Sequence, residues 1–85
     1  MDYIIAVFNS RNAVLKCYQF LSSKGFDVSV ISTPRVKGLS CGICVKIKKE
    51  DYYNIKKALS QYDISNFNSF YEIKKEKQNL VAIKL

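Results

Sequence analysis

Residues 3–25, YIIAVFNSRNAVLKCYQFLSSKG, hold the clearest strand and helix signals of the chain. Residues 3–8 are apolar on both faces, which is typical of a central strand covered on at least one side. Ser10 then stands in the position of a helix N-cap. Beyond it, apolar side chains recur at helical spacing: Val14, Cys17, Tyr18 and Leu21. Gly25 is placed to end this helix, so the pattern predicts a strand followed by a helix over residues 11–24.

Two further strands are predicted in the middle of the chain. Residues 26–33, FDVSVIST, alternate in polarity, and Pro34 ends the run. After a turn, residues 41–47 alternate again, with one parity shared by Cys41, Ile43, Val45 and Ile47. This pattern predicts a third strand.

A second helix and a closing hairpin complete the predicted order. Asp51 is placed to cap a helix, whose inner face is expected to hold Ile55, Ala58, Leu59 and Tyr62. Residues 70–75 and 79–85 are strand-like and flank the polar turn EKQN. The order is βαββαβ plus one extra strand. It predicts an α+β, ferredoxin-like two-layer sandwich with the helices on one face of an antiparallel sheet.

Length and composition favour one cytoplasmic domain over residues 1–85. The 48% hydrophobic content and eleven aromatic residues are typical of a globular chain. The apolar run after Asp2 is far shorter than the ~20 residues that cross a bilayer, and it lacks the marks of a secretory leader. We therefore expect reduced cysteines and no membrane association.

The net charge is +7, and the chain contains no histidine. This removes the commonest general base, the usual partner of a Ser or Cys nucleophile and the commonest transition-metal ligand. Hydrolases and zinc enzymes are disfavoured, and we expect a protein that is not an enzyme and holds no cofactor.

Residues 40–47, SCGICVKI, contain two of the three cysteines and admit three readings. A redox pair of Cys41 and Cys44 needs Cα atoms within about 7 Å. Residues three apart in a strand are roughly 10 Å apart and point to opposite faces, so this reading requires a turn or a helix start instead. A closed zinc site needs about four N or S ligands, which three cysteines without histidine do not supply.

The third reading is a single reactive thiol at Cys41, where a loop meets a strand. Gly42 leaves room for another molecule to approach, and the charges of Arg35 and Lys37 in the same loop favour the thiolate. We expect the start of this strand to lie near the C-terminal ends of the helices, where the helix dipole would oppose a thiolate. The alternative that Cys41 only packs under the loop stays open.

The other two cysteines have structural interpretations. Cys17 lies on the inner face of the first helix and is expected to be a small apolar core residue. Cys44 is expected to face the side opposite Ile43 and Val45 as a half-buried small residue.

The combination STPR followed by SCGICVKI resembles a small bacterial family of selenium/sulfur carrier-like proteins. The resemblance covers most of the chain and is carried by Ser10, Gly25, Pro34, Arg35, Ser40, Cys41 and Gly42. It implies that Cys41 holds sulfur or selenium as a persulfide or selenopersulfide. A cysteine or selenocysteine desulfurase is then the implied donor, and an acceptor enzyme receives the atom. No carrier role is implied for Cys44.

Two other classes compete with the carrier. A basic RNA-recognition module would stack bases on aromatic residues of the first and third strands, but residues 41–47 contain none. Tyr3 and Phe8 are available on the first strand, although aromatic residues in a central strand are more often core. An interaction module without chemistry is the other class, because residues 79–85 would form a bare apolar edge. We expect a homodimer under either the carrier or the module reading.

Overall fold

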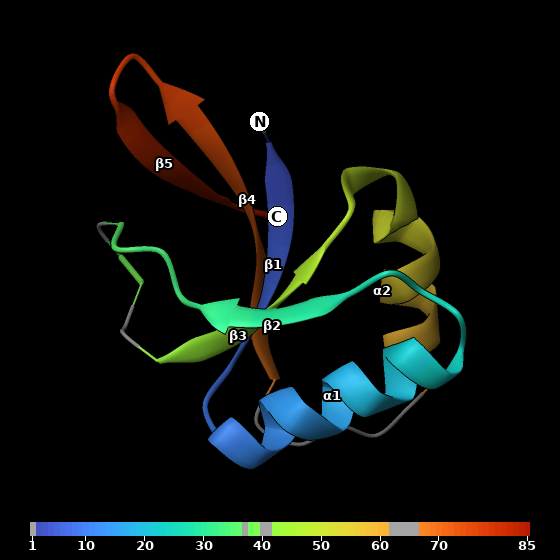
Figure 1. Ribbon diagram of the computed structural model, residues 1–85. Helices are drawn as coiled ribbons and strands as arrows, with labels where there is room; N and C mark the ends of the chain where they lie inside the picture. The colour runs from blue at the N-terminus through green and yellow to red at the C-terminus, as the bar shows by residue number, and fades with distance from the viewer. Residues whose placement is uncertain (1, 37, 40–41, 62–66) are drawn as a thin grey trace.

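The computed structural model describes residues 2–36, 38–39, 42–61 and 67–85. The elements are β1 (Tyr3–Phe8), α1 (Arg11–Ser23), β2 (Ser29–Ser32), β3 (Ile43–Ile47), the short 3-10 helix η1 (Lys49–Asp51), α2 (Tyr52–Ser60), β4 (Phe67–Glu76) and β5 (Asn79–Lys84). The five strands form one antiparallel sheet in the order β2-β3-β1-β4-β5. Figure 1 shows the β4–β5 hairpin projecting away from both helices. The α+β class is confirmed.

The exact ferredoxin-like topology is not confirmed. The observed strand order is β2-β3-β1-β4-β5, and the predicted extra C-terminal strand is present as β5 beyond β4. β2 is shorter than the predicted residues 26–33, because pairing with β3 begins only at Ser29. Asp51 was predicted to cap α2, but its side chain makes no capping hydrogen bond. The chain enters α2 through η1, which leaves Asp51 with helical backbone angles instead of the extended ones of a capping residue.

α1 is set by its two ends. The Ser10 side chain accepts a hydrogen bond from the Ala13 N–H at 3.3 Å, which confirms the predicted N-cap. Gly25, with φ of 91°, takes the left-handed conformation that ends the helix. α1 therefore begins after a connection of only two residues from the end of β1.

The sheet is buried on both faces by two clusters. The helix-side cluster contains alternate β1 residues, Ile4, Ala6 and Phe8, packed against the inner faces of α1 and α2. The opposite-face cluster contains Ile5, Val7, Cys44 and Ile73, with Tyr3, Ile31, Leu39, Tyr71 and Ala82 packed against it. Both faces of β1 are therefore apolar and covered, as its sequence predicts.

The β4–β5 turn has a residue in an unfavourable conformation. Lys77 has a φ of 55°, which costs an L-residue roughly 1 kcal/mol and costs glycine little. Lys77→Gly is expected to raise the melting temperature by about 4–8 °C, the shift that about 1 kcal/mol gives in a domain of this size. Gln78→Gly, at the neighbouring turn position without positive φ, serves as the control and should not stabilise. An unchanged or lower melting temperature for Lys77→Gly would contradict the strain.

Candidate functional site

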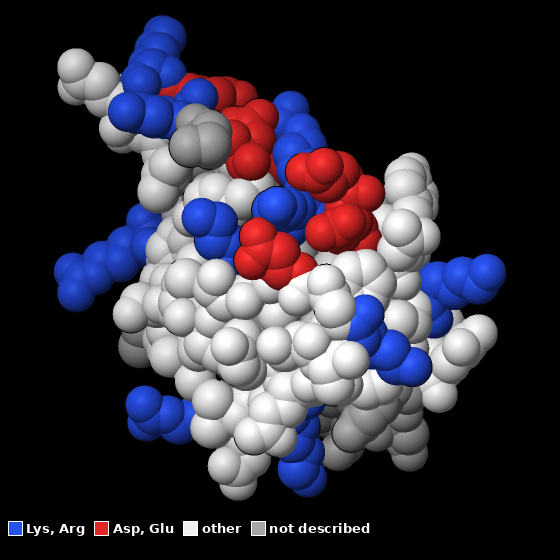
Figure 2. Space-filling model, turned by 45° about the vertical axis from the view of Figure 1, so that its right-hand side comes forward, with Lys and Arg blue, Asp and Glu red and all other residues white. Residues whose placement is uncertain are grey.

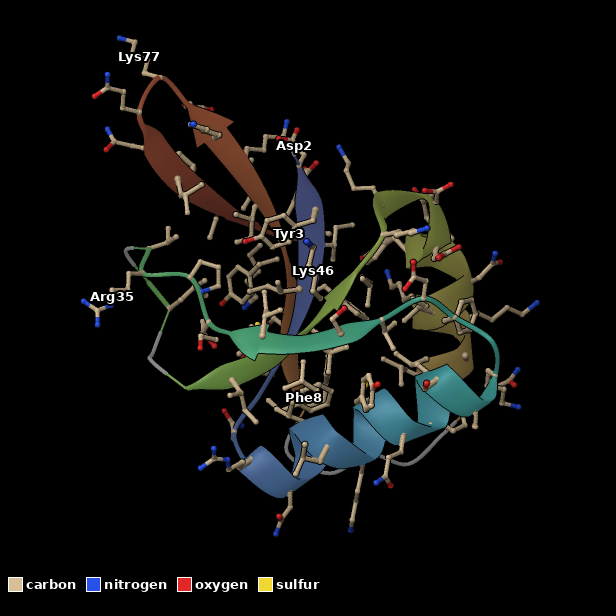
Figure 3. All side chains as sticks on the ribbon, viewed as in Figure 1. Asp2, Tyr3, Phe8, Arg35, Lys46 and Lys77 are labelled. Carbon is tan, nitrogen blue, oxygen red and sulfur yellow. The ribbon has the colours of Figure 1, made fainter. Side chains whose placement is uncertain are left out.

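The structure describes two of the five predicted site residues. Arg35 and Gly42 are described, whereas Lys37, Ser40 and Cys41 lie outside the described residues. Arg35 is in the loop between β2 and β3, and its guanidinium points away from the sheet (Figure 3). The described residue nearest to Cys41 in the chain is therefore Gly42.

Gly42 is held at the edge of the β2–β3 pair. The Thr33 N–H donates to the Gly42 carbonyl at 2.8 Å, which continues the pairing one step beyond Ser32 and Ile43. Its φ of 134° lies in a region that L side chains rarely adopt, which is why β3 begins at Ile43 and not at the predicted Cys41. A Cβ added at Gly42 would meet no described atom within 4 Å. Glycine is therefore required here by the backbone.

Substitution of Gly42 tests this requirement. Gly42→Ala is expected to lower the free energy of unfolding by about 1–3 kcal/mol, the cost of a side chain in a sparsely populated backbone region. Ser32→Ala, at an exposed position of the neighbouring strand, should change it by less than about 0.5 kcal/mol. Urea unfolding measures both. Equal stability of the two variants would show that residue 42 carries no backbone constraint.

The start of β3 lies beside the N-terminus of α1. β1 and β3 are antiparallel with Ala6 opposite Val45, so the end of β1, where the chain turns into α1, adjoins the first residues of β3. A pocket of about 410 Å³ at this point is lined by Phe8, Asn9, Ser10, Arg11, Val14, Gly42 and Ile43. The expectation that this strand would start near helix C-termini was therefore wrong for the helix that lines the pocket.

This polarity determines the electrostatics of the pocket that Gly42 lines. A helix N-terminus carries a partial positive charge that stabilises a nearby anion. The first turn of α1 has no acidic residue, and Arg11 stands at its first position. The α2 C-terminal residues Leu59 and Ser60 line a different pocket, which shares Phe8 with the first. The pocket that Gly42 lines therefore contains a helix N-terminus and Arg11, and none of its described lining residues is acidic.

Cys17 and Cys44 are free thiols sealed in the core. Both residues are 0% exposed. Burial raises the pKa of Cys17 from its ordinary value of 9.0 to about 12. Burial also raises the pKa of Cys44, which a hydrogen bond with the Thr33 side chain offsets only in part. Cys17 is the core residue that was predicted.

The prediction for Cys44 was wrong in one respect. It faces the side opposite Val45, as expected, but it is fully buried and not half-buried, because the opposite-face cluster covers that side of the sheet. Cys44 is also in the extended strand that disfavours a redox pair. Its predicted partner in that reading, Cys41, lies outside the described residues. Among the described residues, no group of three potential metal ligands occurs.

Basic side chains at the other end of β3 are interleaved with acidic ones. Lys48 pairs with Asp27 at 3.2 Å and Lys49 pairs with Glu72 at 2.5 Å. Figure 2 shows acidic and basic residues side by side on one face of the molecule. Lys46 instead places its Nζ 4.8 Å from the centre of the Tyr3 ring (Figure 3). At this end of β3 the positive charge is therefore interrupted by carboxylates.

The family model described as "Putative Se/S carrier protein-like" matches residues 2–72 of the 85-residue chain. The chain belongs to this family. The comparisons with curated proteins and with solved structures gave no match. The matched range includes the loop from Arg35 to Gly42 and the α1 N-terminus, whereas β5 lies beyond it. In the part of the chain that the structure describes, no helix has the length and apolar character to span a bilayer.

The pocket at the α1 N-terminus includes residues that sequence reasoning missed. Asn9 and Arg11 line it, and the Asn68 side chain donates to Asn9 Oδ1 at 3.3 Å, which ties β4 to the end of β1. The antiparallel order of β1 and β3 was the signal that could have located them, because it fixes which end of α1 meets β3.

Proposed function

We propose that this protein carries sulfur or selenium on Cys41, as a persulfide or selenopersulfide, and delivers it to an acceptor enzyme. The observation that carries the proposal is the burial of Cys17 and Cys44, which are 0% exposed with raised pKa values. The chain has three cysteines and belongs to a Se/S carrier-like family, so Cys41 is the remaining thiol for that role.

The transfer step needs only a thiolate on the carrier. The Cys41 thiolate attacks the terminal sulfur of a persulfide on a donor cysteine desulfurase, forming the Cys41 S–S bond and breaking the S–S bond on the donor. The donor cysteine leaves as a thiolate, and the number of sulfane sulfurs is unchanged. Attack by the acceptor enzyme's thiolate on the terminal sulfur then regenerates the Cys41 thiolate. Selenium from a selenocysteine desulfurase follows the same route.

The groups around Gly42 support this role electrostatically. Positive charge lowers a thiol pKa and increases the thiolate fraction at neutral pH. Arg11 and the α1 N-terminus lie at the pocket that Gly42 lines, and Arg35 lies in the preceding loop. We assign the same electrostatic support to Lys37, and we assign a supporting role without charge to Ser40, the neighbour of Cys41 in the chain. The open space beside Gly42 is the proposed approach for the donor's persulfide.

The partner enzymes supply the chemistry that this chain lacks. Desulfurases cleave the C–S or C–Se bond, and the carrier only exchanges a sulfur or selenium atom between thiols. A carrier of this kind needs no histidine, and this chain has none. We therefore propose a non-enzymatic cytoplasmic carrier with no cofactor.

Intact-mass measurement after incubation with a cysteine desulfurase and cysteine tests the proposal. Wild type is expected to gain the mass of one sulfur atom, and Cys41→Ser should gain none. Cys44→Ser is the matched control and should be loaded like wild type, because a serine hydroxyl can keep the hydrogen bond with Thr33. Loading that persists in Cys41→Ser, or no loading of wild type, would contradict the assignment.

A further inference from the structure

β5 is a sheet edge with unpaired backbone groups. It pairs with β4 only, and no segment among the described residues lies along its other side. The Leu85 N–H donates to the Phe70 carbonyl at 3.0 Å. Since backbone groups alternate in direction along a strand, Leu80, Ala82 and Lys84 direct their N–H and C=O groups to the open edge.

This edge lacks the features that usually prevent strand pairing. Edges are protected by charge, proline, bulges or short length. The opposite edge strand, β2, has four residues, begins and ends with serine and is closely followed by Pro34. β5 has six residues, one charged side chain and an uninterrupted register with β4. Of the two edge strands, β5 is therefore the one better suited to pair with a strand of another molecule.

Exposed apolar side chains accompany the open backbone. Leu80 is 44% exposed and Ile83 is 40% exposed. Ile83 lies opposite Glu72, on the helix side of the sheet, but the helix-side cluster contains no β5 residue. Figure 1 shows why, since the hairpin extends beyond the region that the helices cover.

We propose that a second copy of this chain pairs with β5, antiparallel and edge to edge, about a two-fold axis at Ala82. Such an axis places like faces together, so opposed residues have equal parity and the outward groups of Leu80, Ala82 and Lys84 meet. Ala82 then faces Ala82 of the second copy, Leu80 faces Lys84, and Val81 faces Ile83. About six backbone hydrogen bonds form, and the two sheets become one.

Charge is compatible with this register despite the net charge of +7. Lys84 is the one charged residue of β5, and it faces an apolar residue of the second copy. The two Lys84 ammonium groups start four residues apart along the strands, about 14 Å. This separation exceeds the screening length of about 8 Å at physiological salt. An isologous pair of β5 strands therefore brings no like charges into contact.

The pairing is independent of the carrier function. β5 lies beyond the matched residues 2–72 and away from the pocket that Gly42 lines. Failure of sulfur loading would leave the dimer intact as a proposal, and a monomeric chain would leave the carrier proposal intact.

Sedimentation equilibrium of the full chain under reducing conditions tests the interface. Wild type is expected to be a dimer that dissociates on dilution, and Ala82→Pro should be monomeric over the same range. Proline at this position removes an N–H that points to the open edge and leaves the hydrogen bonds with β4 intact. Ala82→Ser keeps the N–H and should dimerise like wild type. Circular dichroism checks that each variant is folded.

A charge-pair experiment tests the register. Ile83→Lys and Val81→Glu should each weaken self-association by at least about tenfold, because a charge then faces an apolar residue. Mixing the two variants should restore dimers, because the ammonium introduced in one chain would face the carboxylate introduced in the other. The charge-pair experiment tests the β5 interface even if Ala82→Pro does not fold. A monomeric wild type, an unaffected Ala82→Pro dimer or no recovery on mixing would overturn the proposal, and a monomer would point to strand pairing with a different protein.

Discussion

Iodoacetamide is expected to modify one of the three cysteines rapidly in the folded protein, and all three after unfolding. The thiolate is the reactive form of cysteine. With a pKa of about 12, Cys17 has about one ten-thousandth of its thiol ionised at pH 8, roughly a thousandfold less than an unperturbed cysteine. Its burial at 0% exposure adds a steric barrier, and Cys44 is buried to the same extent. We expect Cys41 to be the cysteine that reacts.

Peptide mapping identifies the modified residue, and the Cys41→Ser variant is the control. That variant should show no rapid phase while folded, and it should react at two cysteines in denaturant. Rapid modification of Cys17 or Cys44 in the native protein would show that the core is open. No rapid modification of wild type would remove the accessible thiol on which the carrier depends.

The protein is expected to lose stability as the pH rises above 9. The folded state keeps the Cys17 thiol protonated up to about pH 12, whereas the unfolded chain releases that proton from about pH 9. The unfolded state therefore binds fewer protons in this window, and the free energy of unfolding falls with pH. Cys17 alone should account for about 2–3 kcal/mol between pH 8 and pH 11. The raised pKa of Cys44 acts in the same direction.

Urea unfolding at a series of pH values measures this slope. Cys17→Ala is the control, because it removes the titrating thiol and leaves every other ionisable group in place. Its stability at pH 8 should be lower because of the cavity, but its decline with pH should be shallower. Parallel declines for wild type and Cys17→Ala would show that the thiol ionises as easily in the core as in the unfolded chain.

Local sequence patterns were sufficient for most of the fold. The apolar run of β1, the Ser10 cap of α1 and the turn of the β4–β5 hairpin depend on neighbours in the chain, and they lie where the patterns predict. The bounds of β2 were not predictable in this way. Phe26 and Val28 pack against the helix-side cluster with the alternation of a strand, but pairing with β3 decides where β2 begins.

The candidate site could not be predicted without information on the tertiary structure. The burial of Cys44 depends on Leu39, Tyr3 and Tyr71, which converge on the second face of the sheet from different parts of the chain. The direction of α1 at the start of β3 follows from strand order, which no single motif contains. With that direction, the positive end of the α1 dipole, and not its negative end, lies at the pocket that Gly42 lines.

The central claim is that Cys41 carries a transferable sulfur atom, and a release experiment tests it most directly. The protein is loaded by a cysteine desulfurase with radiolabelled cysteine, separated from the donor and treated with excess dithiothreitol, which reduces a persulfide to the thiol and hydrogen sulfide. We predict about one labelled sulfur per chain, released completely as sulfide, and none on Cys41→Ser. Label that remains on Cys41→Ser, or that dithiothreitol does not release from wild type, would contradict the claim.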